Sequence, residues 1–127
     1  MVTAEFSRLE NGSIALKMNG HSTRRIFGEY VVCASISAVF YTLLGYLSNT
    51  FGAMLNVKKV KPGDVDIECV NLSEEAFRMA CIGFLQICEL YPDEISVVNK
   101  VWDSKFCPPP WMDIVKIDLK ENTDGRT

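Results

Sequence analysis

The sequence predicts an α+β domain: a single sheet built from two hairpins and a C-terminal strand, with two helices packed on it in the order ββαββαβ. Three observations support this class. Alternating apolar residues flank turn sequences in residues 2–19 and 55–72. Apolar residues recur at helical spacing in residues 31–50 and 73–91. A last short apolar stretch, residues 95–102, reads as the fifth strand.

The N-terminal hairpin is the clearest of these elements. Apolar and polar residues alternate on both sides of the turn sequence Glu10-Asn11-Gly12. Residues 22–29, which follow the hairpin, are mostly polar, and we expect a mobile loop there. The helix expected from residue 31 to about residue 50 has one apolar stripe, which consists of Val32, Ile36, Val39, Phe40, Leu43 and Leu47.

The second hairpin is expected to have strands 55–60 and 65–72 around the turn Lys61-Pro62-Gly63-Asp64. Ser73 is a plausible N-cap for the second helix, with acidic residues in the first turn and Pro92 as the stop. Its predicted apolar stripe consists of Phe77, Ala80, Phe84, Ile87 and Tyr91.

The chain divides into a domain of residues 1–102 and a C-terminal extension of residues 103–127 to which we assign no role. With 127 residues, one domain is the simplest expectation. The extension contains three consecutive prolines, which require an extended backbone, and ends in a polar tail. Trp102 and Trp111 flank the prolines, and we expect them to pin the extension onto the domain.

Charge and composition limit the function classes. The net charge is −3, and the pI near 5.1 disfavours nucleic acid as a partner. The most apolar stretch, residues 31–47, is interrupted by polar residues, so we expect a buried helix and no membrane partner. The first ten residues lack the pattern of a signal peptide. Five cysteines without a CxxC pair fit free thiols in the cytoplasm.

The only histidine and one cysteine lie where two elements are expected to meet. His21 closes the second strand and Cys33 opens the first helix, twelve residues later. A helix N-terminus and a neighbouring base both favour a thiolate, and the N–H groups near Cys33 and Ala34 are candidate oxyanion donors. Acyl transfer is the reaction class that this pair predicts. A surface histidine and a cysteine that only fills space are the alternative reading, which spacing alone leaves open.

The residues around His21 and Cys33 resemble those of a known protein family. Gly20-His21, the interval to Val32-Cys33-Ala34 and then Ser37-Ala38 resemble the ribosomal-processing cysteine protease family, Prp. The preceding hairpin, the long helix from the cysteine and the second helix ending in Tyr91-Pro92 also fit. The resemblance covers about residues 1–101.

The resemblance implies a cytoplasmic homodimeric endopeptidase that needs no cofactor. Members in some bacteria remove a short N-terminal extension from the large-subunit ribosomal protein numbered twenty-seven, cutting after a phenylalanine. Carried over, His21 is the general base and Cys33 the nucleophile, while Gly20 and Ser37 support them. Residues 22–29 match the loop that covers the site in the family.

Two positions depart from the family pattern, and the extension lies beyond it. Ser22 stands where alanine is usual, and Tyr30 stands where an aspartate is usual, with Glu29 as a possible substitute. Such divergence suits two alternatives to a ribosomal protein substrate: a phage-encoded relative that processes a virion or scaffold protein, and a dimeric binding module without activity.

Several other residues have both a functional and a purely structural interpretation. Arg24 and Arg25 in the loop that contains Gly28 could attract a carboxylate of a peptide, although adjacent loop arginines are more often solvated. An aromatic side chain could fit among Phe27, Tyr30 and Phe40, which we expect instead to be core or loop anchors. Cys69, Cys81 and Cys88 offer too few ligands for a metal site, so we expect none.

Overall fold

The computed structural model describes residues 1–22, 30–103 and 112. Within them the elements follow in the order β1 (Val2–Arg8), β2 (Ile14–Asn19), α1 (Val31–Phe51), β3 (Leu55–Lys61), β4 (Asp64–Cys69), α2 (Glu74–Leu90) and β5 (Ile95–Asn99). Short 3-10 turns, Gly52–Met54 and Asn71–Ser73, precede β3 and α2. The predicted α+β class and the order ββαββαβ are confirmed.

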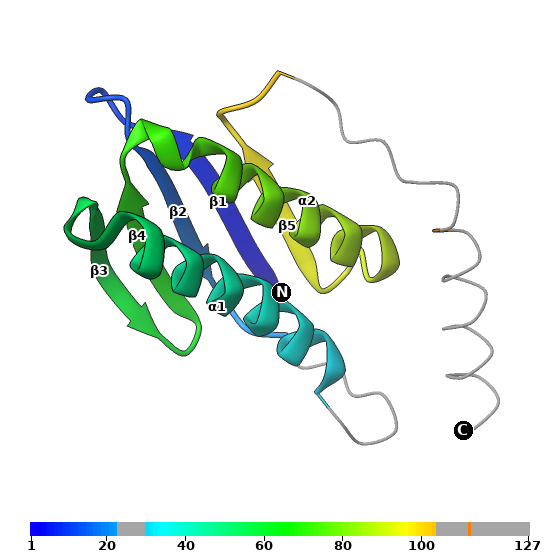
Figure 1. Ribbon diagram of the computed structural model, residues 1–127. Coiled ribbons are helices and arrows are strands. Elements are labelled where there is room, and N and C mark those ends of the chain that lie inside the picture. Colours follow the sequence, from blue (N-terminus) through cyan, green and yellow to red (C-terminus); the bar gives the residue numbers. More distant parts are fainter. Residues whose placement is uncertain (23–29, 104–111, 113–127) are drawn as a thin grey trace, which may run out of the picture.

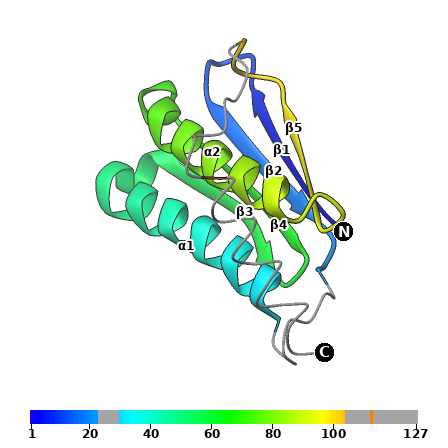
Figure 2. The same cartoon turned by 90° about the vertical axis from the view of Figure 1, so that its right-hand side faces the viewer.

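The strands form one sheet in the order β3-β4-β2-β1-β5. The two hairpins are antiparallel and pair through β2 and β4, whereas β5 lies parallel to β1. A parallel neighbour requires a crossover, and α2 supplies it between β4 and β5. Both helices lie side by side on the same face of the sheet (Figures 1 and 2).

The core lies between this face and the two helices. Alternate residues of β1, such as Phe6, point into it, and so do Leu16 of β2 and Ile67 of β4, all fully buried. The helices contribute Val32, Ile36, Phe40, Leu43 and Leu47 from α1 and Phe77, Ala80, Cys81 and Phe84 from α2. The predicted stripes of both helices therefore face the core, and Val39 and Ile87 pack against it while only partly buried.

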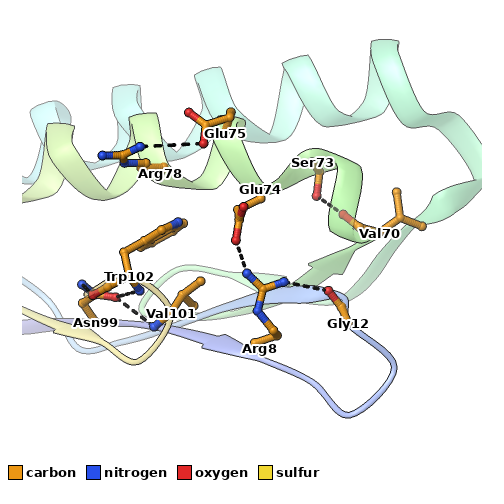
Figure 3. Close-up of polar contacts among 10 residues, drawn as sticks. All are labelled: Arg8, Gly12, Val70, Ser73, Glu74, Glu75, Arg78, Asn99, Val101 and Trp102. Carbon is orange, nitrogen blue, oxygen red and sulfur yellow. Dashed lines mark hydrogen bonds and ion pairs between the residues drawn. The ribbon is translucent and has the colours of Figure 1, made fainter. Parts of the chain in front are cut away.

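Two predicted strands are shorter than expected. The predicted strand 65–72 ends at Cys69 because the chain turns into a 3-10 turn that leaves Leu72 79% exposed. The predicted strand 95–102 ends at Asn99, whose side-chain oxygen accepts hydrogen bonds of 2.9 Å from the N–H groups of Val101 and Trp102 (Figure 3). That local hydrogen bonding competes with a continued ladder.

The start of α2 is held differently from the prediction. Ser73 precedes the helix, but its hydroxyl donates to the carbonyl of Val70 and makes no capping hydrogen bond. Glu74, the first helical residue, instead pairs with Arg8 at the end of β1, and Arg8 also donates to the carbonyl of Gly12 at 3.3 Å (Figure 3). Arg8 thus ties the first hairpin turn to α2.

The C-terminal extension is described only at Asp103 and Met112. Trp102 itself is partly buried, and its ring lies 5.8 Å from that of Phe6. Met112 is buried. Trp111 lies outside the described residues, so the pinning of the extension by both tryptophans stays a prediction, as does the boundary after residue 102.

Helix α1 bears on the expected absence of a membrane partner, which stays a prediction. Residues Val31–Met54, which are α1 with the 3-10 turn after it, are long and apolar enough to cross a membrane by length and composition. In the fold α1 instead lies along the sheet with one side buried, and only 28% of its most apolar window is covered. Much apolar surface of α1 therefore faces outward.

Candidate active site

The end of β2, the start of α1 and the turn between β3 and β4 lie at the same end of the sheet (Figure 1). Residues of all three segments line a cavity of about 230 Å³. His21 and Cys33 both line it, together with Gly20, Ser22 and Ser37. The apolar part of the wall includes Val2, Met18, Ile36 and Val65. The fold therefore brings the predicted histidine and cysteine to one cavity.

His21 follows β2 directly, and its backbone is fixed from two sides. Gly20 has φ 101°, and a β-carbon there would overlap the carbonyl of Met1, so only glycine fits. The N-terminal ammonium of Met1 donates to the carbonyl of His21 at 3.0 Å. His21 is exposed and lines the cavity.

The next residue, Ser22, is anchored to the residue that precedes the edge strand β5. Its side chain is buried, and its hydroxyl donates to Oε2 of Glu94 at 2.8 Å. Glu94 immediately precedes β5, and its N–H and carbonyl also hold the turn to Tyr91 and Val2. Sequence reasoning missed Glu94, because its partner lies 72 residues away.

Cys33 is the third residue of α1 and is partly buried. Its N–H has no acceptor inside the helix, because that acceptor would precede the first helical residue. The N–H of Ala34, in contrast, donates to the carbonyl of Tyr30 at 3.0 Å, and the Ala34 side chain is exposed. Of the two predicted oxyanion donors, the Ala34 N–H is therefore already engaged. Ser37 lies one turn further on and lines the same cavity.

The remaining predicted site residues are divided between the cavity, the surface and the undescribed part of the chain. Phe40 is buried and lines the cavity, whereas Tyr30 is 48% exposed at the start of α1. Five residues of the expected loop, Arg24, Arg25, Phe27, Gly28 and Glu29, lie outside the described residues. The roles expected for that loop stay predictions.

The turn between β3 and β4 is part of the site and was missed as such. Lys61, Pro62 and Gly63 line the cavity, and the N–H of Gly20 donates to the carbonyl of Gly63 at 3.0 Å. The Pro-Gly pair indicates a turn in the sequence. Its position beside His21 follows only from the pairing of β4 with β2, which no local pattern specifies.

The other described cysteines are packed away from this cavity. Burial raises the pKa of the Cys81 thiol to about 11, and burial together with the nearby Glu89 raises the pKa of Cys88. Cys69 is buried in β4. Among the described residues, no group of three or more His, Cys, Asp or Glu side chains is arranged to hold a metal ion.

Comparisons with known proteins concern the family and the fold of the chain. The sequence profile of the family described as cysteine protease Prp matches residues 1–96. Two structures of the essential ribosomal processing protease Prp from S. aureus are similar in fold. One carries a covalently linked product peptide and is 20% identical with a TM-score of 0.67, and the other carries a substrate peptide and is 21% identical with a TM-score of 0.63. Each alignment covers 79% of this chain and 100% of the S. aureus chain.

A structure from Streptococcus mutans is also similar, at 18% identity and a TM-score of 0.61, covering 80% of this chain and 96% of that one. No curated protein sequence matches the chain.

Proposed function

This chain belongs to the cysteine protease Prp family, and from that premise we propose that it cleaves peptide bonds with Cys33 as nucleophile and His21 as general base. The observation that carries the proposal is the shared cavity: a histidine from the end of β2 and a cysteine from the first turn of α1 line it together. These are the two groups that thiol-dependent acyl transfer requires.

The start of α1 provides a field that suits a negatively charged group. The first turn of α1, residues 31–34, contains no acidic residue, so no carboxylate of that turn offsets the positive end of the helix dipole. A thiolate at the third helical position is stabilised by that field and by the N–H groups of the first turn. The same N–H groups, with that of Cys33 as the candidate, are suited to an oxyanion.

The reaction then takes two steps. The Cys33 sulfur attacks the scissile carbonyl carbon, and the proton held by His21 passes to the leaving amine as the C–N bond breaks. A thioester remains. His21 then removes a proton from water, the hydroxide oxygen attacks the thioester carbon, and the sulfur leaves as a thiolate. Gly20 and Ser37 support the two groups in this proposal.

Tyr30 gives the proposal its sharpest internal test. The family usually has an aspartate there, a residue suited to orient the histidine or hold the covering loop. In this proposal another group takes that role, and the hydrogen bond from Ser22 to Glu94, one residue after His21, brings a carboxylate close to the site.

For the substrate, we propose a protein with a short cleavable N-terminal extension. Two structures similar in fold are called ribosomal processing protease, one of them with a substrate peptide. The family resemblance narrows the target to the large-subunit ribosomal protein numbered twenty-seven. A virion or scaffold protein is the alternative target, and the genes beside this one separate the two: ribosomal protein genes favour the first, and head-assembly genes the second.

The homodimer and the cytoplasmic location implied by the resemblance are proposals as well. A groove of about 520 Å³ on the outer side of α1 and α2 offers an apolar surface for a second copy, with Tyr46 and Met79 54% and 72% exposed at its edges. Sedimentation equilibrium of the native protein and of Met79→Glu tests this. A native monomer rejects the dimer, and an equally dimeric variant rejects this face.

The first experiment is iodoacetamide labelling across pH, with each cysteine followed by peptide mass spectrometry. Cys33 is expected to react well below pH 8, and His21→Ala is expected to slow it. Cys81 and Cys88 serve as internal controls in the same sample, because their raised pKa values keep them protonated. Slow labelling of Cys33 at a rate that is unchanged in His21→Ala rejects the dyad and favours the binding module.

A second measurement uses the substrate. Incubation with ribosomal protein numbered twenty-seven that carries its N-terminal extension is expected to yield the shortened protein, and Cys33→Ser is expected to abolish cleavage while the fold remains. Retained cleavage by a folded Cys33→Ser variant contradicts the role of Cys33.

A further inference from the structure

The turn between β3 and β4 touches the side chain of the proposed base. Gly63 has φ 76°, and its α-carbon lies against the imidazole of His21. A β-carbon at Gly63 would lie 3.0 Å from Cδ2 of His21 and closer still to Nε2 and Cε1. Those approaches are shorter than van der Waals contact, so the ring occupies the space that a side chain at Gly63 would need.

The backbone fixes the turn relative to this ring. The N–H of Gly20 donates to the carbonyl of Gly63 at 3.0 Å, and Asn19 pairs with Asp64 in the ladder between β2 and β4. Two hydrogen-bonded strands thus hold the residue before His21 and the residue in contact with its ring in one register. The turn cannot move away from His21 without breaking that ladder.

We infer that Gly63 is a positioning residue for His21: its bare backbone seats the imidazole in the cavity that Cys33 lines. This inference rests on the proposed function for its effect on the reaction, but not for its effect on the ring. A larger residue at Gly63 has to push the imidazole to another position. Since base and nucleophile work only in a narrow geometry, that displacement lowers the rate.

The chain supplies a matched control for this contact. Gly12, in the turn of the first hairpin, has φ 89°, and a β-carbon there would meet only the β-carbon of Asn71, at an ordinary 3.9 Å. Gly12→Ala and Gly63→Ala therefore share the strain of an alanine at positive φ. Only Gly63→Ala also collides with His21.

The test compares the two variants in the full chain by two readouts. The chain has a single histidine, so the Cε1–H resonance of His21 is identified without ambiguity in an NMR spectrum. We expect this resonance to shift in Gly63→Ala and to stay in place in Gly12→Ala. We also expect Cys33 labelling by iodoacetamide to slow by about 10- to 100-fold in Gly63→Ala only, approaching the rate of His21→Ala.

The outcomes separate this inference from the proposed function. An unchanged His21 resonance in a folded Gly63→Ala variant overturns the positioning role. A shifted resonance with unchanged Cys33 labelling, in a protein where His21→Ala also has no effect, supports the positioning role and rejects the dyad. If Gly63→Ala does not fold, Gly63→Asn and Gly12→Asn repeat the comparison, because asparagine tolerates positive φ better.

Discussion

Helices α1 and α2 pack side by side on one face of the same sheet, yet they present their cysteines in opposite ways. Cys33 lies in the first turn of α1, partly buried beside a cavity that His21 also lines. Cys81 lies in the middle of α2, 2% exposed, and burial raises its pKa to about 11. The difference teaches that the place of a thiol on its helix decides its burial and its neighbours, on which the reactivity proposed for Cys33 depends.

The first turns of α1 and α2 also differ in charge. α2 begins with Glu74 and Glu75, which complement the positive end of its dipole, whereas the first turn of α1 has no acidic residue. A pair of carboxylates stabilises the start of α2 as a structural element. The start of α1 keeps its positive field for another anion, which in the proposed function is the thiolate of Cys33.

The largest expected effect tests whether α2 is scaffold. Phe84 is fully buried on α2, with its ring 6.1 Å from that of Phe6. Phe84→Ala is expected to lower the free energy of unfolding by about 3–5 kcal/mol, because it leaves a cavity in the core. Glu89→Ala, at an exposed position of the same helix, is the control and should change this free energy by less than about 0.5 kcal/mol. Both are measured by urea unfolding, and similar losses would contradict the assignment of faces.

A smaller effect tests the buried thiol through pH. The folded state holds the Cys81 pKa near 11, whereas the unfolded chain has its ordinary value near 9. Below pH 9 the thiol is neutral in both states, so its contribution to stability is fully present there. Between pH 9 and pH 11 the unfolded state ionises first, and this contribution is lost.

Urea unfolding at pH 8 and at pH 10.5 measures this loss. The native protein is expected to lose more stability between these pH values than Cys81→Ala does. Cys33→Ala is the matched control on α1. Equal losses in the native protein and in Cys81→Ala would show that burial of the thiol does not resist ionisation.

The smallest effect concerns the anchor beside His21. Ser22→Ala removes the hydrogen bond to Glu94 and is expected to cost about 1–2 kcal/mol of unfolding free energy, because the lost partner is a carboxylate. Glu94→Gln retains an acceptor of the same shape and should cost less. If the bond also holds His21, both variants shift the His21 ring resonance. An unshifted resonance in both would limit the bond to a structural role.

Much of the fold could be predicted from the sequence because the patterns that specify its elements are local. Alternation in β1 and β2, the turn sequence around Gly12 and the apolar stripe ending before Pro92 each lie within one element. The strand ends were less predictable. Leu72 and Trp102 read as strand residues, but a 3-10 turn and the side chain of Asn99 end the two strands earlier.

The sequence by itself determined that His21 follows a strand and that Cys33 lies at the start of a helix, because both elements are specified by patterns in neighbouring residues. Only the tertiary structure decided what surrounds them. Gly63 reaches His21 through the pairing of β4 with β2, and Glu94 reaches Ser22 across the sheet. Strand pairing is set by the sum of many long-range contacts, so no local pattern predicts which turn will lie against the imidazole of His21.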